Sequence, residues 1–95
     1  MTTIDHRQNA ETHIARLASV LEALPATSER DALVAECRSL AVAIRAFHME
    51  GIRFRMFNVE RMLAKADAAF GPEAASAFSQ ARASLEAAGF HTRSH

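Results

Sequence analysis

The stretch FHMEGIRFRMFNVERM, residues 47–62, decides how the middle of this chain folds. It combines large apolar side chains with arginines at positions 53, 55 and 61, and Gly51 interrupts it near its start. Either one helix continues through this glycine, or the chain turns there and begins a new helix. An interior glycine weakens a helix by only about 1 kcal/mol, so its presence alone does not decide between the two.

Two apolar stripes of helical spacing meet at this glycine. Before it come Leu33, Cys37, Leu40, Ile44 and Phe47, and after it come Ile52, Met56, Val59, Leu63, Ala66 and Phe70. On a single helix these stripes lie about 100° apart around the axis. A new helix after Gly51 needs a Ser, Thr, Asp or Asn cap, which Met49, Glu50 and Ile52 do not provide. We therefore predict one helix over residues 28–70 and keep a break at Gly51 as the alternative.

Helix boundaries are also visible on both sides of this segment. Apolar residues at every third or fourth position predict a helix over residues 4–24, which Pro25 ends. The pair Gly71 and Pro72 predicts a stop and a restart, because glycine suits the position after a helix and proline suits a first helical turn. A last helix is predicted over residues 72–88.

The composition predicts an all-α protein. Alanine is abundant, whereas the 95 residues contain only 3 glycines and 2 prolines, and these preferences favour helices. We predict a single helical domain of residues 1–95: a small bundle of three helices with a long central one, followed by a tail over residues 89–95. The alternative is a four-helix up-down bundle broken at Gly51. Because a long helix in so short a chain is difficult to cover, we expect dimerisation to complete the bundle.

The central stretch is also the predicted contact surface. A helix that is apolar on several sides is usually buried from several sides, and a second copy of the chain would cover it. Gly51 is either a point of close approach between two helices or a kink or turn. The predicted interface with a second copy or another protein consists of Phe47, Gly51, Ile52, Phe54, Met56, Phe57 and Asn58.

Basic residues cluster in the middle of the chain and raise the question of an anionic partner. Candidate contacts for an anion or an acidic partner are Arg45, Arg53, Arg55, Arg61 and Lys65. They do not share one helical face, so we favour a mixed surface with ion pairs to Glu22, Glu29 or Glu36. A formal net charge of zero also argues against a nucleic-acid partner.

No pattern in the sequence predicts catalysis. Nucleophile elbows, phosphate-binding glycine loops and zinc signatures are absent from it. His48 and Met49 are weak metal candidates, but adjacent residues point about 100° apart on a helix. Cys37 lies on the core stripe, where a thiol acts as a small apolar group. We expect no cofactor and no metal site.

The function predicted from these patterns is that of a non-enzymatic interaction or regulatory module acting as a helical homodimer. It is expected in the cytoplasm and not in a membrane, because the chain shows neither a leader sequence nor an apolar run of about 18 residues. The first alternative is a helical protein that binds a metal or small ligand through His48, Met49 and the central basic residues. A DNA-binding regulator is the second alternative.

Overall fold

A computed structural model describes residues 5–90 of the chain, except the side chains of residues 67 and 68. Its elements are α1 (His6–Glu22), α2 (Ser28–Arg45), α3 (Met49–Lys65), the short 3-10 helix η1 (Asp67–Phe70) and α4 (Gly71–Ala87). The predicted all-α class and small helical bundle are confirmed. The bundle has four α-helices within the described residues, in place of the three predicted.

The long helix predicted over residues 28–70 is wrong. α2 ends at Arg45 and α3 begins at Met49, so the chain turns over residues 46–48, just before Gly51. The turn follows from Phe47, which adopts a left-handed backbone conformation with a φ of 57°. Its N–H donates to the carbonyl of Ile44, and the N–H of the next residue donates to the carbonyl of Ala43, both at 3.1 Å. These two bonds close the end of α2 in the manner usual for a left-handed residue.

α3 begins with a histidine cap. The Nδ1 atom of His48 accepts a hydrogen bond from the N–H of Gly51 at 3.1 Å, which satisfies one of the free donors of the first turn. A Cβ atom at position 51 would overlap this ring nitrogen. Gly51 therefore lies in the first turn of a helix, where its missing side chain makes room for the cap.

The two ends of α1 and the start of α4 carry residues that are common at helix ends. Asp5 caps α1 by accepting a hydrogen bond from the N–H of Gln8 at 2.9 Å, while the predicted start at residue 4 lies outside the described residues. The helix gives way to a turn at Ala23, ahead of the proline. Gly71 has a φ of +83° and is the first residue of α4, and Pro72 follows it in the first turn.

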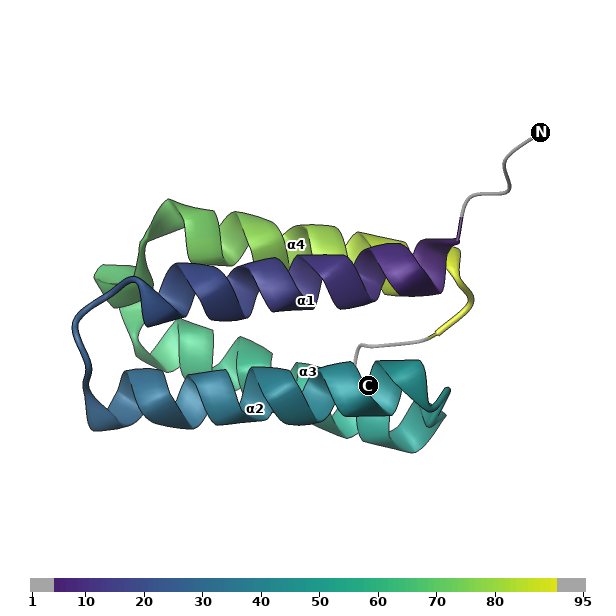
Figure 1. Cartoon of the computed structure of the whole chain (residues 1–95), viewed down its shortest axis with the longest axis horizontal. Coiled ribbons are helices and arrows are strands. Elements are labelled where there is room, and N and C mark those ends of the chain that lie inside the picture. Colours follow the sequence, from purple (N-terminus) through teal and green to yellow (C-terminus); the bar gives the residue numbers. More distant parts are fainter. Residues whose placement is uncertain (1–4, 91–95) are drawn as a thin grey trace.

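The four α-helices run alternately up and down (Figure 1). α1 packs against both α2 and α4, and α2 packs against α3. α3 and α4 make little contact with each other, so the bundle is not closed on that side. The molecule measures 41 × 31 × 19 Å, and its smallest dimension corresponds to about two helix diameters. α3 is consequently covered by neighbours on only part of its circumference.

One hydrophobic core joins the helices, and each helix contributes one side to it. The buried apolar residues are Ala10, Ile14, Leu17 and Leu21 of α1; Leu33, Val34, Cys37, Leu40 and Ile44 of α2; Ile52, Met56 and Val59 of α3; Ala74, Ala77, Phe78, Ala81 and Leu85 of α4; and Phe70 and Phe90 beside them. Between residues 5 and 90, no helix combines the length and apolar character needed to cross a membrane.

Candidate interaction surface on α3

α3 has two sides of different character. Ile52, Met56 and Val59 face the core, and all three have an exposed fraction of 0%. The opposite side carries Phe54 and Phe57, whose exposed fractions are 57% and 44%. A helix that is covered on one side normally presents polar residues on the other. These two aromatic rings are therefore the unusual feature of α3.

Four exposed residues follow one another along this outer side: Glu50, Phe54, Phe57 and Arg61. We call them the α3 stripe. At about 100° per residue they fall within about 60° of one another around the helix. The stripe has an acid at its N-terminal end, two aromatic rings in its middle and a base at its C-terminal end. A shallow hollow of about 240 Å³ lies beside the rings, with Glu50 and Arg53 also lining it.

Arginine side chains rest on both rings of the stripe. The guanidinium of Arg61 lies 5.8 Å from the centre of the Phe57 ring, and that of Arg55 lies 5.3 Å from the centre of the Phe54 ring. Both distances lie within the range at which a cation is attracted to an aromatic face. Arg55 also donates to the carboxylate of Glu36 on α2. The rings are thus partly ordered before any partner arrives, which lowers the entropy lost on binding.

The other predicted interface residues lie elsewhere. Ile52 and Met56 are buried in the core of their own chain. Asn58 donates from its side-chain amide to Glu36 at 3.0 Å and so links α3 to α2. Phe47 lies in the α2–α3 turn with 63% of its surface exposed, and the guanidinium of Arg7 lies 4.6 Å from the centre of its ring. Phe54 and Phe57 are the predicted residues that the structure places together on an outer surface.

The five central cations do not gather into one patch. Arg45 pairs with Glu11 of α1 at 2.8 Å, and Arg55 pairs with Glu36 of α2, one of the partners that the sequence indicated. The other three are exposed on α3: Arg53, Arg61 and Lys65. Arg53 lies about 80° around the helix from Arg61, so the two point to different sides.

The residues considered as metal ligands have other roles in the structure and do not form a site together. The Nδ1 atom of His48 already accepts the capping hydrogen bond, and Met49 is half-exposed at the first position of α3. Burial raises the pKa of the Cys37 thiol from 9.0 to about 12, and the negative charge of Glu36 adds to the effect. This thiol is therefore neutral and enclosed near pH 7. Among the side chains that the structure describes, no three His, Cys, Asp or Glu gather in a way that could hold a metal ion.

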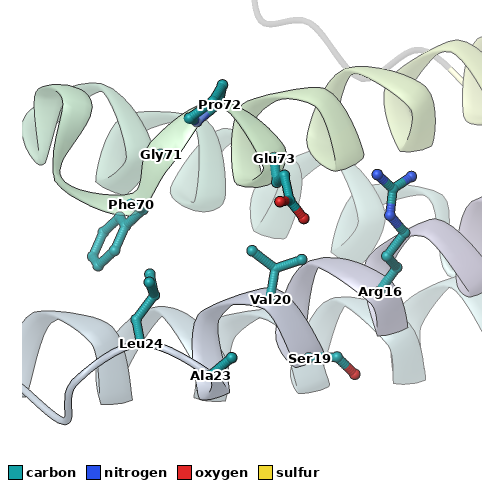
Figure 2. Close-up of a pocket in the computed structure, with 9 residues that line it drawn as sticks. All are labelled: Arg16, Ser19, Val20, Ala23, Leu24, Phe70, Gly71, Pro72 and Glu73. Atoms are coloured by element: carbon teal, nitrogen blue, oxygen red, sulfur yellow. The ribbon is translucent and has the colours of Figure 1, made fainter.

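A second surface feature is a groove between the end of α1 and the start of α4 (Figure 2). It has a volume of about 610 Å³ and is lined by Arg16, Ser19, Val20, Ala23, Leu24, Phe70, Gly71, Pro72 and Glu73. Arg16 donates to the side-chain oxygen of Gln80 on α4 at 2.8 Å, so one of its guanidinium nitrogens already has a partner. Glu73 is the one carboxylate among these lining residues and has neither a histidine nor a second acid beside it there. The groove thus offers an open apolar surface without an acid–base pair.

Sequence reasoning missed Glu50 as a member of the α3 stripe. The signal was present, since positions 50, 54, 57 and 61 have the four-three-four spacing of a helical seam. The prediction of one continuous helix grouped the residues after Gly51 with the apolar stripe of α2, so this separate line of residues was not identified. Once α3 begins at Met49, Glu50 becomes the first residue of a separate outer line.

The groove was also not predicted from the sequence, because its residues come from two segments about fifty positions apart.

Comparisons with known proteins found no similar protein for this chain. It matches no protein-family model, no curated protein and no solved structure.

Proposed function

We propose that this chain is a non-enzymatic interaction module that forms a helical homodimer through the α3 stripe. The observation that supports this is the exposure of Phe54 and Phe57 side by side on the outside of α3. Fully burying a phenylalanine side chain contributes about 1.5–3 kcal/mol relative to leaving it in water. Two half-exposed rings therefore leave part of that free energy for association.

A second copy is the partner that the properties of the chain favour. The formal net charge is zero, so two copies approach without long-range repulsion. The stripe carries one acid and one base, which gives it charges of both signs. A helical domain of this size also gains from association, because it buries a smaller share of its surface than a larger domain does. The stripe lies on the side of α3 opposite its buried residues, where Phe54 and Phe57 are exposed to such a partner.

The alternative functions have weaker support. A metal at His48 would have to compete for the ring nitrogen that caps α3. An anionic ligand or DNA would meet a scattered set of cations, of which Arg45 and Arg55 already pair with carboxylates of their own chain. Neither alternative accounts for the two exposed rings.

Sedimentation across a dilution series tests the proposal. We expect the native chain to pass from monomer to dimer in the range of about 1–100 μM, as weak dimers do. The double variant Phe54→Ser/Phe57→Ser removes the aromatic centre of the stripe and should remain monomeric over that range. Because both rings are exposed in the monomer, circular dichroism should show an unchanged helix content.

The matched control is Val42→Ser on α2, which also replaces an exposed apolar side chain, 62% accessible, but leaves the α3 stripe intact. This variant should dimerise as the native chain does. A native chain that remains monomeric across the series, or a double variant that dimerises as well as the native chain, would overturn the proposal.

A further inference from the structure

The charges of the α3 stripe define how two copies would pair, if the dimer just proposed is formed. Along the stripe the order is acid, ring, ring, base: Glu50, Phe54, Phe57 and Arg61. The spacing of four, three and four positions reads the same in both directions along the helix, while the charges at its two ends are opposite. A surface of this kind is complementary to a copy of itself that is turned end to end.

We infer that the two copies pair α3 against α3 in antiparallel orientation, about a two-fold axis that passes between residues 55 and 56. This axis sets Phe54 of each copy against Phe57 of the other. The same operation sets Glu50 of each copy against Arg61 of the other. A two-fold interface contains every contact twice, so two ring pairs form the centre and two opposite-charge pairs flank it.

A parallel pairing of the same stripe would be repulsive at both ends. It would set Glu50 against Glu50 and Arg61 against Arg61, and like charges across an interface select against an arrangement. The aromatic rings alone tolerate either direction. The charges at the ends therefore fix the orientation, as charged flanking positions do in coiled coils.

The side chains can reach these partners. Packed helices lie about 8–10 Å apart between their axes, and both glutamate and arginine side chains extend over several bonds. Arg61 lies over the ring of Phe57 in the single chain. In the antiparallel pair its guanidinium keeps that ring beneath it and meets the carboxylate of Glu50 from the other copy. Within the described residues, Glu50 forms no ion pair of its own that would compete.

Charge reversal tests the orientation. Glu50→Arg alone and Arg61→Glu alone each place like charges at both ends of an antiparallel dimer, and should raise its Kd at least about ten-fold. The double variant Glu50→Arg/Arg61→Glu restores both pairs and should return the Kd to within about three-fold of the native value.

A control is needed because Glu50 also lies in the first turn of α3, where the helix dipole favours an acid. Glu73 occupies the corresponding first turn of α4, away from the stripe. Glu73→Arg should therefore introduce the same unfavourable charge at a helix start and leave the Kd unchanged.

Cross-linking provides a second test that does not depend on affinity. In the antiparallel pair, an equal mixture of Glu50→Cys chains and Arg61→Cys chains brings one engineered thiol from each chain together at one end and keeps the native Glu50 and Arg61 opposite each other at the other end. A short bis-maleimide should therefore yield a covalent dimer from the mixture. Two copies of the same variant would hold their engineered thiols about 16 Å apart along the helix, too far for the reagent to join them. Glu50→Cys alone and Arg61→Cys alone should each give no covalent dimer above that of the native chain, whose only cysteine, Cys37, is buried.

The outcomes separate the orientation from the dimer itself. Covalent dimer from Glu50→Cys alone, or single charge reversals that leave the Kd unchanged in a chain that dimerises through its phenylalanines, would overturn the antiparallel pairing and leave the proposed function standing. A chain that stays monomeric would overturn both. Rescue by the double charge reversal, together with covalent dimer from the mixture of the two cysteine variants and from neither variant alone, would establish the orientation.

Discussion

Phe47 and His48 together end one helix and begin the next. Phe47 adopts the left-handed conformation, which costs a residue with a side chain about 1–2 kcal/mol. His48 then accepts the hydrogen bond from the N–H of Gly51. This bond requires the Nδ1 atom to be free of a proton, so the neutral ring must carry its hydrogen on Nε2. The turn between α2 and α3 therefore rests on a strained backbone and an uncommon cap.

The cap and the glycine should be energetically coupled. We expect His48→Ala to lower the free energy of unfolding by about 1 kcal/mol, the usual loss for a helix cap. Gly51→Ala in the native background should change it little. Alanine improves helix propensity by about 1 kcal/mol, but its Cβ displaces the imidazole and removes the cap.

The coupling appears when the two substitutions are combined. With His48→Ala already present there is no ring to displace, so adding Gly51→Ala should stabilise the chain by about 1 kcal/mol. Urea unfolding of the native chain, the two single variants and the double variant gives the four free energies of this cycle. Purely additive effects would show that the glycine is not required by the cap.

At the scale of elements, α2 and α3 are joined by a polar link beside their apolar contact. Glu36 accepts hydrogen bonds from both Arg55 and Asn58, and its side chain is only 15% exposed. A hydrogen bond to a charged group contributes about 1.5–3 kcal/mol when it is shielded from water. The pair between Glu22 and Arg38 joins α1 to α2, but its side chains are 47% and 68% exposed.

Removing each glutamate should separate these two cases. Glu36→Ala should lower the free energy of unfolding by about 1–2 kcal/mol, because two partners on α3 lose their acceptor. Glu22→Ala should change it by less than about 0.5 kcal/mol, because exposed ion pairs contribute little. Urea unfolding measures both values. Equal losses from the two variants would contradict the view that shielding makes the Glu36 link the stronger one.

The sequence predicted the class of the fold because all four helices carry strong apolar periodicity. The core positions of α3 were likewise visible in the sequence as the stripe through Ile52, Met56 and Val59. The α2–α3 break was kept only as the alternative, and at Gly51, because the two signals at residues 46–48 are unusual. A phenylalanine in a left-handed conformation is rare, and histidine is not among the preferred caps. Gly51 was the candidate position for a break, although it lies in the first turn of α3.

The candidate site was predicted in part. Phe54 and Phe57 were identified as contact residues because α3 carries more apolar surface than one side can use. The sequence could not assign its apolar residues to the core or to a partner, because that depends on which neighbours cover α3. Only the packing of α3 on α2, with little contact to α4, shows that Ile52 and Met56 face inward and the two rings outward.

At the scale of the whole molecule, the open bundle predicts a stability that depends on concentration. A partner that binds the folded chain stabilises it by mass action, by about 1.4 kcal/mol when the partner is at ten times its Kd. For a domain of this size, each kcal/mol raises the Tm by about 4–8 °C. In a homodimer the chain is its own partner, and at a total concentration of about ten times the Kd only about a fifth of it stays free, so the gain is about 1 kcal/mol. Raising the concentration from below the Kd to that level should therefore raise the Tm by about 4–8 °C.

The Phe54→Ser/Phe57→Ser variant supplies the comparison, because it removes the centre of the α3 stripe and leaves the buried core intact. Its Tm should be independent of concentration, because the variant lacks the aromatic centre through which two copies would pair. Calorimetry of both chains over the same dilution series measures the difference. A native Tm that does not change with concentration would mean that the folded chain gains no stability from a second copy, and that the outer side of α3 does not contribute to folding.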